Sequence, residues 1–305
     1  MKKRYIALFL ICFTLCLTAI PGFISNKQGK NVKSFTSALL NKKYVQKINS
    51  IYVGDSVDVL HFYKDENWLC NYGDLTFYAN PTIINQMIDS FSANRNLISV
   101  SNNIKNQKEY GISEEKSFNI SFYNEDLVGN KNEFSKIFFG NENSDRTMIY
   151  LKSNKNQTVY STINDLYPYL TTKLEIFSLN QLFPLVQTKT ESTITNIECI
   201  EYLENENKSK IKRSGDQDFQ EIVHKLLSSN GGTFFQEDIL QSDNIKHSHT
   251  IILTDNENKY YILDIYSYSN NLGEQYFVKT SFPEKSKDVN YVLEISAWTK
   301  SRLIF

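Results

Sequence analysis

One long apolar run constrains this chain more than any other feature of its sequence. The run covers residues 5–20 almost without interruption, extends to residue 24, and follows three basic residues at positions 2–4. A basic segment in front of an apolar one is typical of secretory signals and membrane anchors, and the positive charge tends to stay on the cytoplasmic side. We therefore predict that residues 5–24 bind the chain to the cell membrane in a single pass. The C-terminal body is then expected outside the cytoplasm, in the periplasm.

Length and cleavage signals bear on whether this segment is retained. Residues 5–24 provide about twenty positions, just enough for a helix that crosses the hydrocarbon core. The tripeptide at 17–19 is a poor cleavage site, because only one of its two critical positions holds a small residue, and Pro21 follows closely. The sequence favours an uncleaved anchor over a removed signal peptide, with residues 1–25 as the N-terminal segment in either case.

The four cysteines leave lipidation and disulfide pairing open. Cys12 and Cys16 lie in the apolar run, and neither follows the small residues that lipid attachment requires. A disulfide between Cys70 and Cys199 could form outside the cytoplasm, although two buried thiols are the favoured state.

Composition indicates a folded body with many strands. A chain of 305 residues with 41% hydrophobic residues is long enough for two domains. Lys and Arg number 33 against 34 Asp and Glu, a net charge of -1. Because nucleic-acid binding needs a concentrated basic face, we expect no nucleic-acid partner. The 19 Tyr and 20 Phe, set against 11 Gly and 5 Pro, favour strands.

The first half predicts one helix among many short strands. Apolar residues at 83, 84, 87, 88 and 91 form one helical stripe, with Asn80 as the cap and Pro81 in the first turn. A second, short helical pattern covers 163–174. Strands are predicted at 51–53, 57–62, 68–70, 97–101, 118–123, 134–139, 148–152 and 158–160.

The second half repeats this order. A helix is predicted at 217–227, and a short terminal helix begins near Ser296. Strands are predicted at 194–202, 233–235, 250–253, 260–265, 276–280 and 291–295. Corresponding elements lie about 130–140 residues apart, and a common offset is the signature of an internal repeat.

These patterns predict an α+β fold. An N-terminal transmembrane helix is followed by two tandem copies of an antiparallel β-sheet unit, each covered by one amphipathic helix. The predicted divisions are the anchor at 1–25, a linker at 26–44, a first unit at 45–187 and a second, diverged unit at 188–305. Residues 188–192 are the expected join.

The first unit contains an ordered set of short motifs. They are Asn67-Trp68-Leu69, Glu109-Tyr110-Gly111-Ile112, Ile137-Phe138-Phe139-Gly140, Met148-Ile149-Tyr150-Leu151-Lys152 and Thr158-Val159-Tyr160. This set resembles the DUF4340 family of bacterial membrane-associated proteins. The second half carries the same element order but lacks these motifs.

The resemblance implies a partner and not a reaction. The activity of DUF4340 proteins is undefined, and members resemble accessory parts of ABC-type export systems, including those linked to gliding motility. We expect a non-enzymatic, membrane-anchored component of a cell-envelope or ABC-type transport assembly, with integral-membrane transporter subunits as partners. The alternative is an exported ligand-binding module with a cleft between its two repeats.

The histidines do not predict a catalytic or metal site. His247 and His249 would share one face of a regular strand and could bind zinc, but no Cys or Glu at ligand spacing accompanies them. A solvated loop in front of the strand at 250–253 is the favoured interpretation. His61 and His224 are isolated, and we expect each at a surface or a core edge. An enzyme, the third hypothesis, would depend on His247 or His249.

Other candidate motifs also have structural explanations. A Ser-His-Asp triad is not excluded, but no Gly-x-Ser-x-Gly elbow occurs. Gly231-Gly232 lacks the phosphate-loop pattern and is interpreted as a helix stop. We therefore predict no catalytic residue, metal ligand or cofactor. The acidic pairs expected at solvated turns are Asp65-Glu66, Glu114-Glu115 and Glu237-Asp238.

Aromatic residues crowd the second half, and two interpretations apply. Exposed Tyr is typical of interaction surfaces, whereas burial on the core face of a sheet is the commoner role of large rings and is favoured here. The residues are Tyr260, Tyr261, Tyr266, Tyr268, Tyr276 and Phe277.

Overall fold

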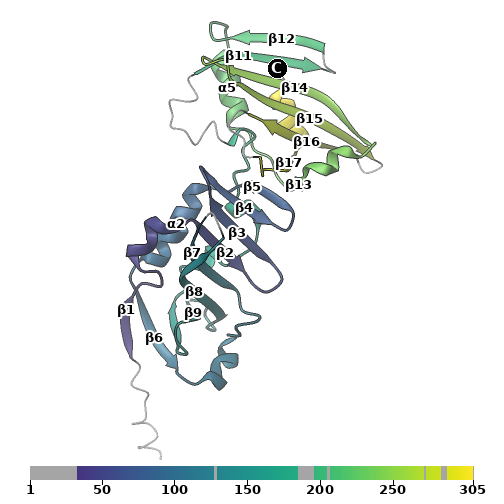
Figure 1. Cartoon of the computed structure of the whole chain (residues 1–305). Coiled ribbons are helices and arrows are strands. Elements are labelled where there is room, and N and C mark those ends of the chain that lie inside the picture. Colours follow the sequence, from purple (N-terminus) through teal and green to yellow (C-terminus); the bar gives the residue numbers. More distant parts are fainter. Residues whose placement is uncertain are drawn as a thin grey trace, which may run out of the picture.

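Two antiparallel sheets, lying end to end, make up most of the protein (Figure 1). The computed structural model describes residues 33–126, 129–184, 196–204, 207–270, 273–282 and 287–304. The predicted anchor at 5–24 and the predicted join at 188–192 lie outside the described residues. Ten strands form one sheet and seven form the other, with a few short helices beside them. The described part of the chain is therefore mostly β.

The ten-stranded sheet has the order β1-β6-β10-β9-β8-β7-β2-β3-β4-β5. The helical elements in this part of the chain are η1 (Lys42–Lys47), α2 (Pro81–Ser92), η2 (Ile104–Tyr110), η3 (Tyr167–Tyr169) and α3 (Leu174–Phe177). The strands are β1 (Ser34–Ser37), β2 (Ser50–Gly54), β3 (Val59–Lys64), β4 (Trp68–Tyr72), β5 (Leu75–Tyr78), β6 (Arg95–Ser101), β7 (Asn119–Glu125), β8 (Lys131–Glu142), β9 (Met148–Ser153) and β10 (Val159–Ile163).

The seven-stranded sheet has the order β12-β11-β14-β15-β16-β17-β13. Its helical elements are α5 (Phe219–Leu227), η5 (Glu237–Gln241) and α6 (Ala297–Leu303). The strands are β11 (Ile197–Glu204), β12 (Asn207–Arg213), β13 (Phe234–Gln236), β14 (Ile245–Asp255), β15 (Tyr260–Asn270), β16 (Gly273–Ser281) and β17 (Tyr291–Ile295).

The two sheets share one strand order. Seven neighbouring strands of the larger sheet, β3-β2-β7-β8-β9-β10-β6, correspond one by one to the whole smaller sheet. The hairpin β2–β3 precedes α2 in the larger sheet, and the hairpin β11–β12 precedes α5 in the smaller one. The strand after the helix, β6 or β13, pairs antiparallel with the last strand of a four-stranded meander. The larger sheet adds β4 and β5 at one edge and β1 at the other.

Helix α2 forms for the reasons that its sequence suggests. The Asn80 side chain accepts hydrogen bonds from the backbone N–H groups of Thr82 and Ile83, and Pro81 occupies the first turn, where its missing N–H costs nothing. The buried stripe of α2 includes Ile84 and Phe91. The Phe91 ring lies 5.1 Å from that of Phe122 on β7, so α2 covers the sheet through this stripe.

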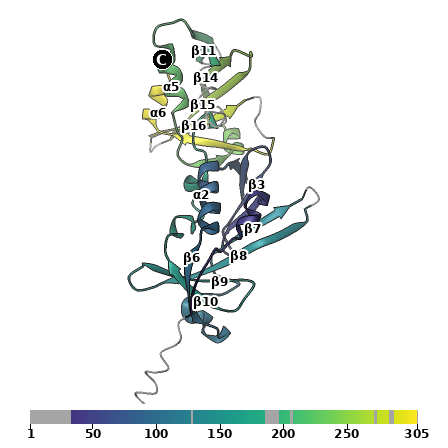
Figure 2. The ribbon, with the colours of Figure 1, turned by 90° about the vertical axis from the view of Figure 1, so that its left-hand side faces the viewer.

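Helices α5 and α6 cover one side of the smaller sheet (Figure 2). Phe219, Val223, Leu226 and Leu227 are the buried residues of α5. Ser296 caps α6 by accepting a hydrogen bond from the backbone N–H of Thr299. The terminal helix is therefore where the sequence predicted it.

One apolar core runs through both sheets. The edge strand β5 meets β13 and β17, where the rings of Phe77 and Phe234 are 5.2 Å apart and those of Phe234 and Tyr291 are 5.1 Å apart. Asn290 joins the same edge, because its side-chain oxygen accepts a 2.7 Å hydrogen bond from the N–H of Thr76. Burial raises the pKa of Tyr291 far above its ordinary value. The two sheets are therefore joined by packed side chains as well as by the chain itself.

The structure corrects several sequence predictions. A continuous helix at 163–174 is wrong, since β10 ends at Ile163 and only the short η3 and α3 follow. Strands β5 and β12 were not predicted. The described part of the predicted linker contains secondary structure, because β1 pairs with β6 and η1 precedes β2. Among the helices that the structure describes, none has both the length and the apolar character for a membrane span.

Introducing a charge into α2 or α5 tests which residues of these helices pack in the core. Ile84 on α2 and Val223 on α5 are fully or almost fully buried, whereas the neighbouring Ile222 on α5 is only partly buried. We expect Ile84→Asp and Val223→Asp each to lower the free energy of unfolding by more than about 4 kcal/mol, because an unpaired charge would enter the core. Ile222→Asp should cost clearly less in denaturant titrations. Equal losses for Ile222 and Val223 would contradict the described orientation of α5.

Candidate functional site

The face of the larger sheet opposite α2 carries a group of polar and aromatic side chains. Side chains alternate between the faces of a strand, so Ile51 and Phe62 point toward the core while their neighbours point away. Tyr52, His61 and Tyr123 occupy these outward positions on β2, β3 and β7. We call this side the open face.

His61 is at the centre of the open face. Its ring stacks on that of Tyr52, with centroids 4.2 Å apart and planes 3° from parallel, because the two residues are directly paired across β2 and β3. The hydroxyl of Ser50 lies 3.1 Å from its Nε2. The rings of Tyr123 and Tyr52 meet edge to face, with their centroids 5.5 Å apart. Burial lowers the pKa of His61, because the charged imidazolium loses water.

One lysine and one glutamate complete this cluster. The Lys131 ammonium hydrogen-bonds to the hydroxyl of Tyr52, which is the main reason that the pKa of Lys131 is raised. Glu125 Oε2 lies 3.6 Å from Lys131 Nζ and 4.0 Å from His61 Nε2. The same oxygen is buried, and the described residues provide no hydrogen-bond donor to it. The cluster therefore combines opposite charges, a half-buried imidazole and stacked rings on one surface.

Two cavities of about 340 Å³ each lie beside the cluster. One is bounded by Tyr52, Tyr123, Lys131 and other residues of β2, β7 and β8. The other is bounded by His61, Tyr63, Glu125 and Asp288, so it receives one residue from the second half of the chain. Burial, followed by the nearby Asp288 carboxylate, raises the pKa of Tyr63 to about 12. Tyr63 thus stays a neutral hydrogen-bonding group.

Motif residues of the first half meet where η2 crosses the same side of the sheet. Ile112, Phe138 and Val159 form a small separate apolar cluster, and Tyr110 and Tyr150 pack against it. Gly140 lies so close to η2 that an added Cβ would be 2.1 Å from the carbonyl oxygen of Tyr110. Gly111 adopts φ 72°, a left-handed conformation that suits glycine. These motif residues therefore have a shared structural task, which is to hold the segment 104–117 on the sheet. We call this segment the strap.

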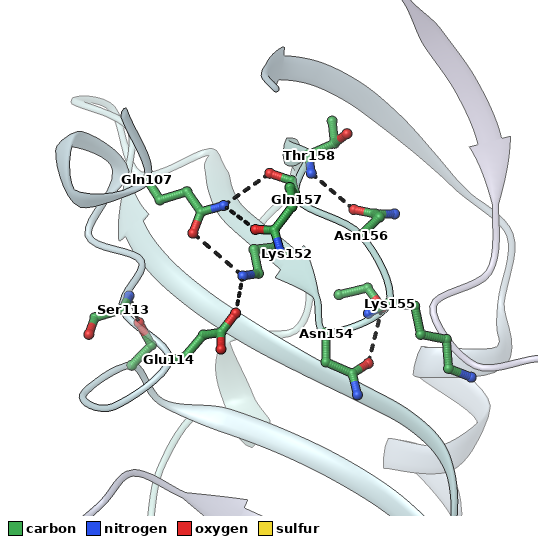
Figure 3. Close-up of polar contacts among 11 residues, drawn as sticks. Gln107, Ser113, Glu114, Lys152, Asn154, Lys155, Asn156, Gln157 and Thr158 are labelled. Carbon is green, nitrogen blue, oxygen red and sulfur yellow. Dashed lines mark hydrogen bonds and ion pairs between the residues drawn. The ribbon is translucent and has the colours of Figure 1, made fainter. Parts of the chain in front are cut away.

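A buried lysine adds a polar tie to the strap (Figure 3). Lys152, whose side chain is 1% exposed, lies on β9 and donates to Glu114 Oε1 at 2.5 Å and to Gln107 Oε1 at 3.4 Å. Gln107 in turn donates to the carbonyl and side-chain oxygens of Gln157. The Lys152 hydrogen bond lowers the pKa of Glu114. Since an ammonium that is buried alone is costly, Lys152 requires the strap to stay in place.

The two histidines of the second half do not form a joint site. Both lie in β14, and not in a loop as predicted, but a register shift between them breaks the alternation. His247 pairs with Tyr266, whereas His249 pairs with Ile265 and approaches Tyr202, so their side chains face opposite sides. Among the described residues, no group of three or more His, Cys, Asp or Glu could hold a metal ion.

His247, Thr250 and Asp264 lie close together without forming a relay. The Thr250 hydroxyl donates to Asp264 Oδ1 at 2.6 Å and lies 2.9 Å from His247 Nε2. Asp264 Oδ1 is 3.4 Å from the same nitrogen of His247. In a catalytic triad the carboxylate and the hydroxyl contact different imidazole nitrogens. This arrangement is therefore unlike that of a nucleophilic site.

Other predicted residues have local roles. The C-cap of α5 is Ser228 and not Gly231. Gly231 instead allows close contact with Leu293. Glu237 pairs with Lys279 at 2.8 Å, so this acidic residue is not only a solvated turn residue. The thiols of Cys70 and Cys199 form no disulfide. His224 is exposed. Of the aromatic residues in the second half, Tyr261, Tyr276 and Phe277 are buried, whereas Tyr260 is 57% exposed.

Comparison with family models, with curated proteins and with solved structures gives no match to this chain. The resemblance to DUF4340 proteins therefore stays a prediction.

Sequence reasoning missed the open-face cluster, whereas it singled out several motif residues that meet at the strap without predicting their structural role. Tyr52, Glu125 and Lys131 carry no motif, and they are brought to His61 only by strand pairing across β2, β3 and β7 and by the β7–β8 hairpin. Strand alternation could have assigned Tyr52 to one face of its strand and His61 to one face of its own strand. It could not have shown that these two faces lie on the same side of the sheet.

Adding a methyl group at Gly140 tests the strap. Gly140→Ala should lower the free energy of unfolding by about 2–3 kcal/mol, because backbone atoms of Tyr110 would have to move. Gly215→Ala is the matched control, since its added Cβ meets no atom within 4 Å. Chemical denaturation of both variants makes the comparison. Equal stabilities would show that the strap does not require the close approach.

The depressed pKa of His61 predicts a pH dependence of stability. The unfolded chain binds this proton more tightly than the folded one, so stability is present above the ordinary value of 6.5 and is lost as pH falls through the lower folded value. His249, whose pKa is also lowered by burial, contributes in the same direction. In urea titrations between about pH 5 and 7.5, His61→Gln should flatten this loss. The exposed His224→Gln should not, and equal slopes for the two variants would refute the assignment.

Proposed function

We propose that this protein is a non-enzymatic, membrane-anchored, extracytoplasmic component of a cell-envelope assembly, such as an ABC-type transport system. In this proposal residues 5–24 anchor the chain, and the open face binds integral-membrane partner subunits. The resemblance to DUF4340 proteins points to the same class of assembly.

The open face is the observation that carries the proposal. It is the sheet surface opposite α2, and it presents stacked rings together with Lys131 and Glu125. Tyr side chains and paired charges are typical of protein interfaces, where rings provide contact area and charges provide orientation. Nothing among the described groups on this surface has the geometry of a nucleophile with its base.

The architecture suits a rigid interaction module. We infer that the two sheets are diverged copies of one unit, each with an antiparallel sheet and a covering helix, because their strand orders correspond. The continuous core at β5, β13 and β17 supports a fixed spacing between the units. A stiff body of this kind can hold partners at a set distance from a membrane anchor.

Charge reversal on the open face tests partner binding. Full-length protein in mild detergent should co-purify with integral-membrane subunits, and Lys131→Glu should lower their recovery at least about fivefold, because it places a second anion beside Glu125. Lys225→Glu on α5 is the control, since the side chains of Lys131 and Lys225 are both 43% exposed. Repeated recovery of no membrane subunit would contradict the proposal, as would equal losses in the two variants.

Fractionation tests the anchor separately. The full chain should stay in the membrane pellet at high salt, and a chain that begins at Gln28 should not. A soluble periplasmic form with a new N-terminus after Ala19 would instead identify a cleaved signal peptide.

The cavity beside Asp288 favours a second candidate function. Because it includes residues of both halves, it is the described cavity that best fits an exported ligand-binding module. Native mass spectrometry of protein purified from its own periplasm would then detect a small molecule bound to a cleaved chain. A mass equal to that of the bare polypeptide would count against this candidate.

A further inference from the structure

Three chain segments come together at one end of the larger sheet. Strand β1 starts at Ser34, which pairs with Ile98 on β6, and β6 then runs on to Ser101 and into η2. Val159 at the start of β10 pairs with Ser101, so the β9–β10 turn is at the same end. We call this end, formed by the start of β1, η2 and residues 154–157, the tip. It lies at the opposite end of the molecule from the seven-stranded sheet (Figures 1 and 2).

Chain length places the tip near the bilayer if the proposed anchor is correct. Residues 25–33 separate the apolar run from Ser34, and the ten steps from residue 24 to residue 34 reach at most about 35 Å when fully extended. The start of β1 cannot lie farther than this from the membrane end of the anchor. The smaller sheet, at the other end of the body, is under no such limit.

The side chains at the tip match a lipid surface. Ile104, at the start of η2, is 61% exposed although it is strongly apolar. Lys105 and Lys108 on η2 are exposed, as is Lys33 just before β1. The strap also carries Lys116, and its acidic residues are Glu109, Glu114 and Glu115. One exposed apolar residue among several cations is the pattern of segments that lie on anionic membranes.

The strap presents these groups on a fixed support. Asn103 caps η2 by accepting from the N–H of Lys105, and Gln107 ties the same turn to Gln157. Lys152 holds the following residues through Glu114. The side chains of Ile104 and Lys108 are therefore carried by a segment that is bound to the sheet, and they lose little freedom on docking.

We propose that the tip is a second membrane contact, which docks on anionic phospholipid headgroups. Lys33, Lys105 and Lys108 face the phosphates, and Ile104 enters the interfacial layer. This inference rests on the proposed function and deepens it, because a body held at two points stands in one orientation and directs its open face toward membrane-embedded partners.

Photo-crosslinking tests the contact in the full chain. A photoreactive phenylalanine analogue is placed at Ile104 or, as the control, at Trp298 on α6, which is 66% exposed at the far end of the body. The protein is reconstituted in vesicles of phosphatidylcholine with or without phosphatidylglycerol. We expect lipid adducts at position 104 at least about fivefold above those at 298, and a clear decrease without phosphatidylglycerol or at high salt.

Charge reversal gives an independent measurement. The double variant Lys105→Glu, Lys108→Glu should reduce the adduct at position 104 to the level of position 298, while its thermal unfolding should stay unchanged because both side chains are exposed. If the chain resists extraction from the vesicles but position 104 yields no more adduct than position 298, the tip contact is wrong and the anchor stands. If alkaline carbonate releases the chain, the anchor fails, and this inference fails with it.

Discussion

The packing of β5 against β13 and β17 is the contact on which the overall shape depends. Each sheet has an edge that would otherwise expose backbone groups and aromatic rings, and exposed sheet edges invite unwanted pairing. Phe77 and Phe234 cover this junction, and Asn290 satisfies the N–H of Thr76 on the edge strand. Because the core is continuous there, one sheet is a fixed extension of the other.

A second constraint is the alternation of side chains between the two faces of the larger sheet. Helix α2 packs on one side of the larger sheet, so the alternating residues of β2, β3 and β7 must go to the other side. There they contact one another, which explains the stacking of Tyr52 on His61, and Lys131 from β8 lies over the Tyr52 ring. The polar cluster is thus a consequence of strand alternation, and the same surface is available to a partner.

The strap shows why a motif can be informative about structure and silent about chemistry. Gly111, Gly140 and Lys152 are found in the short signatures that resemble DUF4340 proteins. Gly111 adopts a left-handed conformation, Gly140 permits close backbone packing, and the buried Lys152 pairs with Glu114. Their shared effect is to fix η2 at the end of the sheet.

The sequence by itself determined most of the local structure. Asn80, Pro81 and the stripe that includes Ile84 specify α2, and alternation specifies most strands, because these signals act between residues that are close in the chain. The repeated order of elements was also visible in the sequence. Only the tertiary structure decided that His247 and His249 face opposite sides, since a register shift in β14 is set by pairing with β15. It alone brought Glu125 and Lys131 to His61 and Asp288 to Tyr63, because such contacts depend on strand register and on the packing of one sheet against another, over distances that no local pattern encodes.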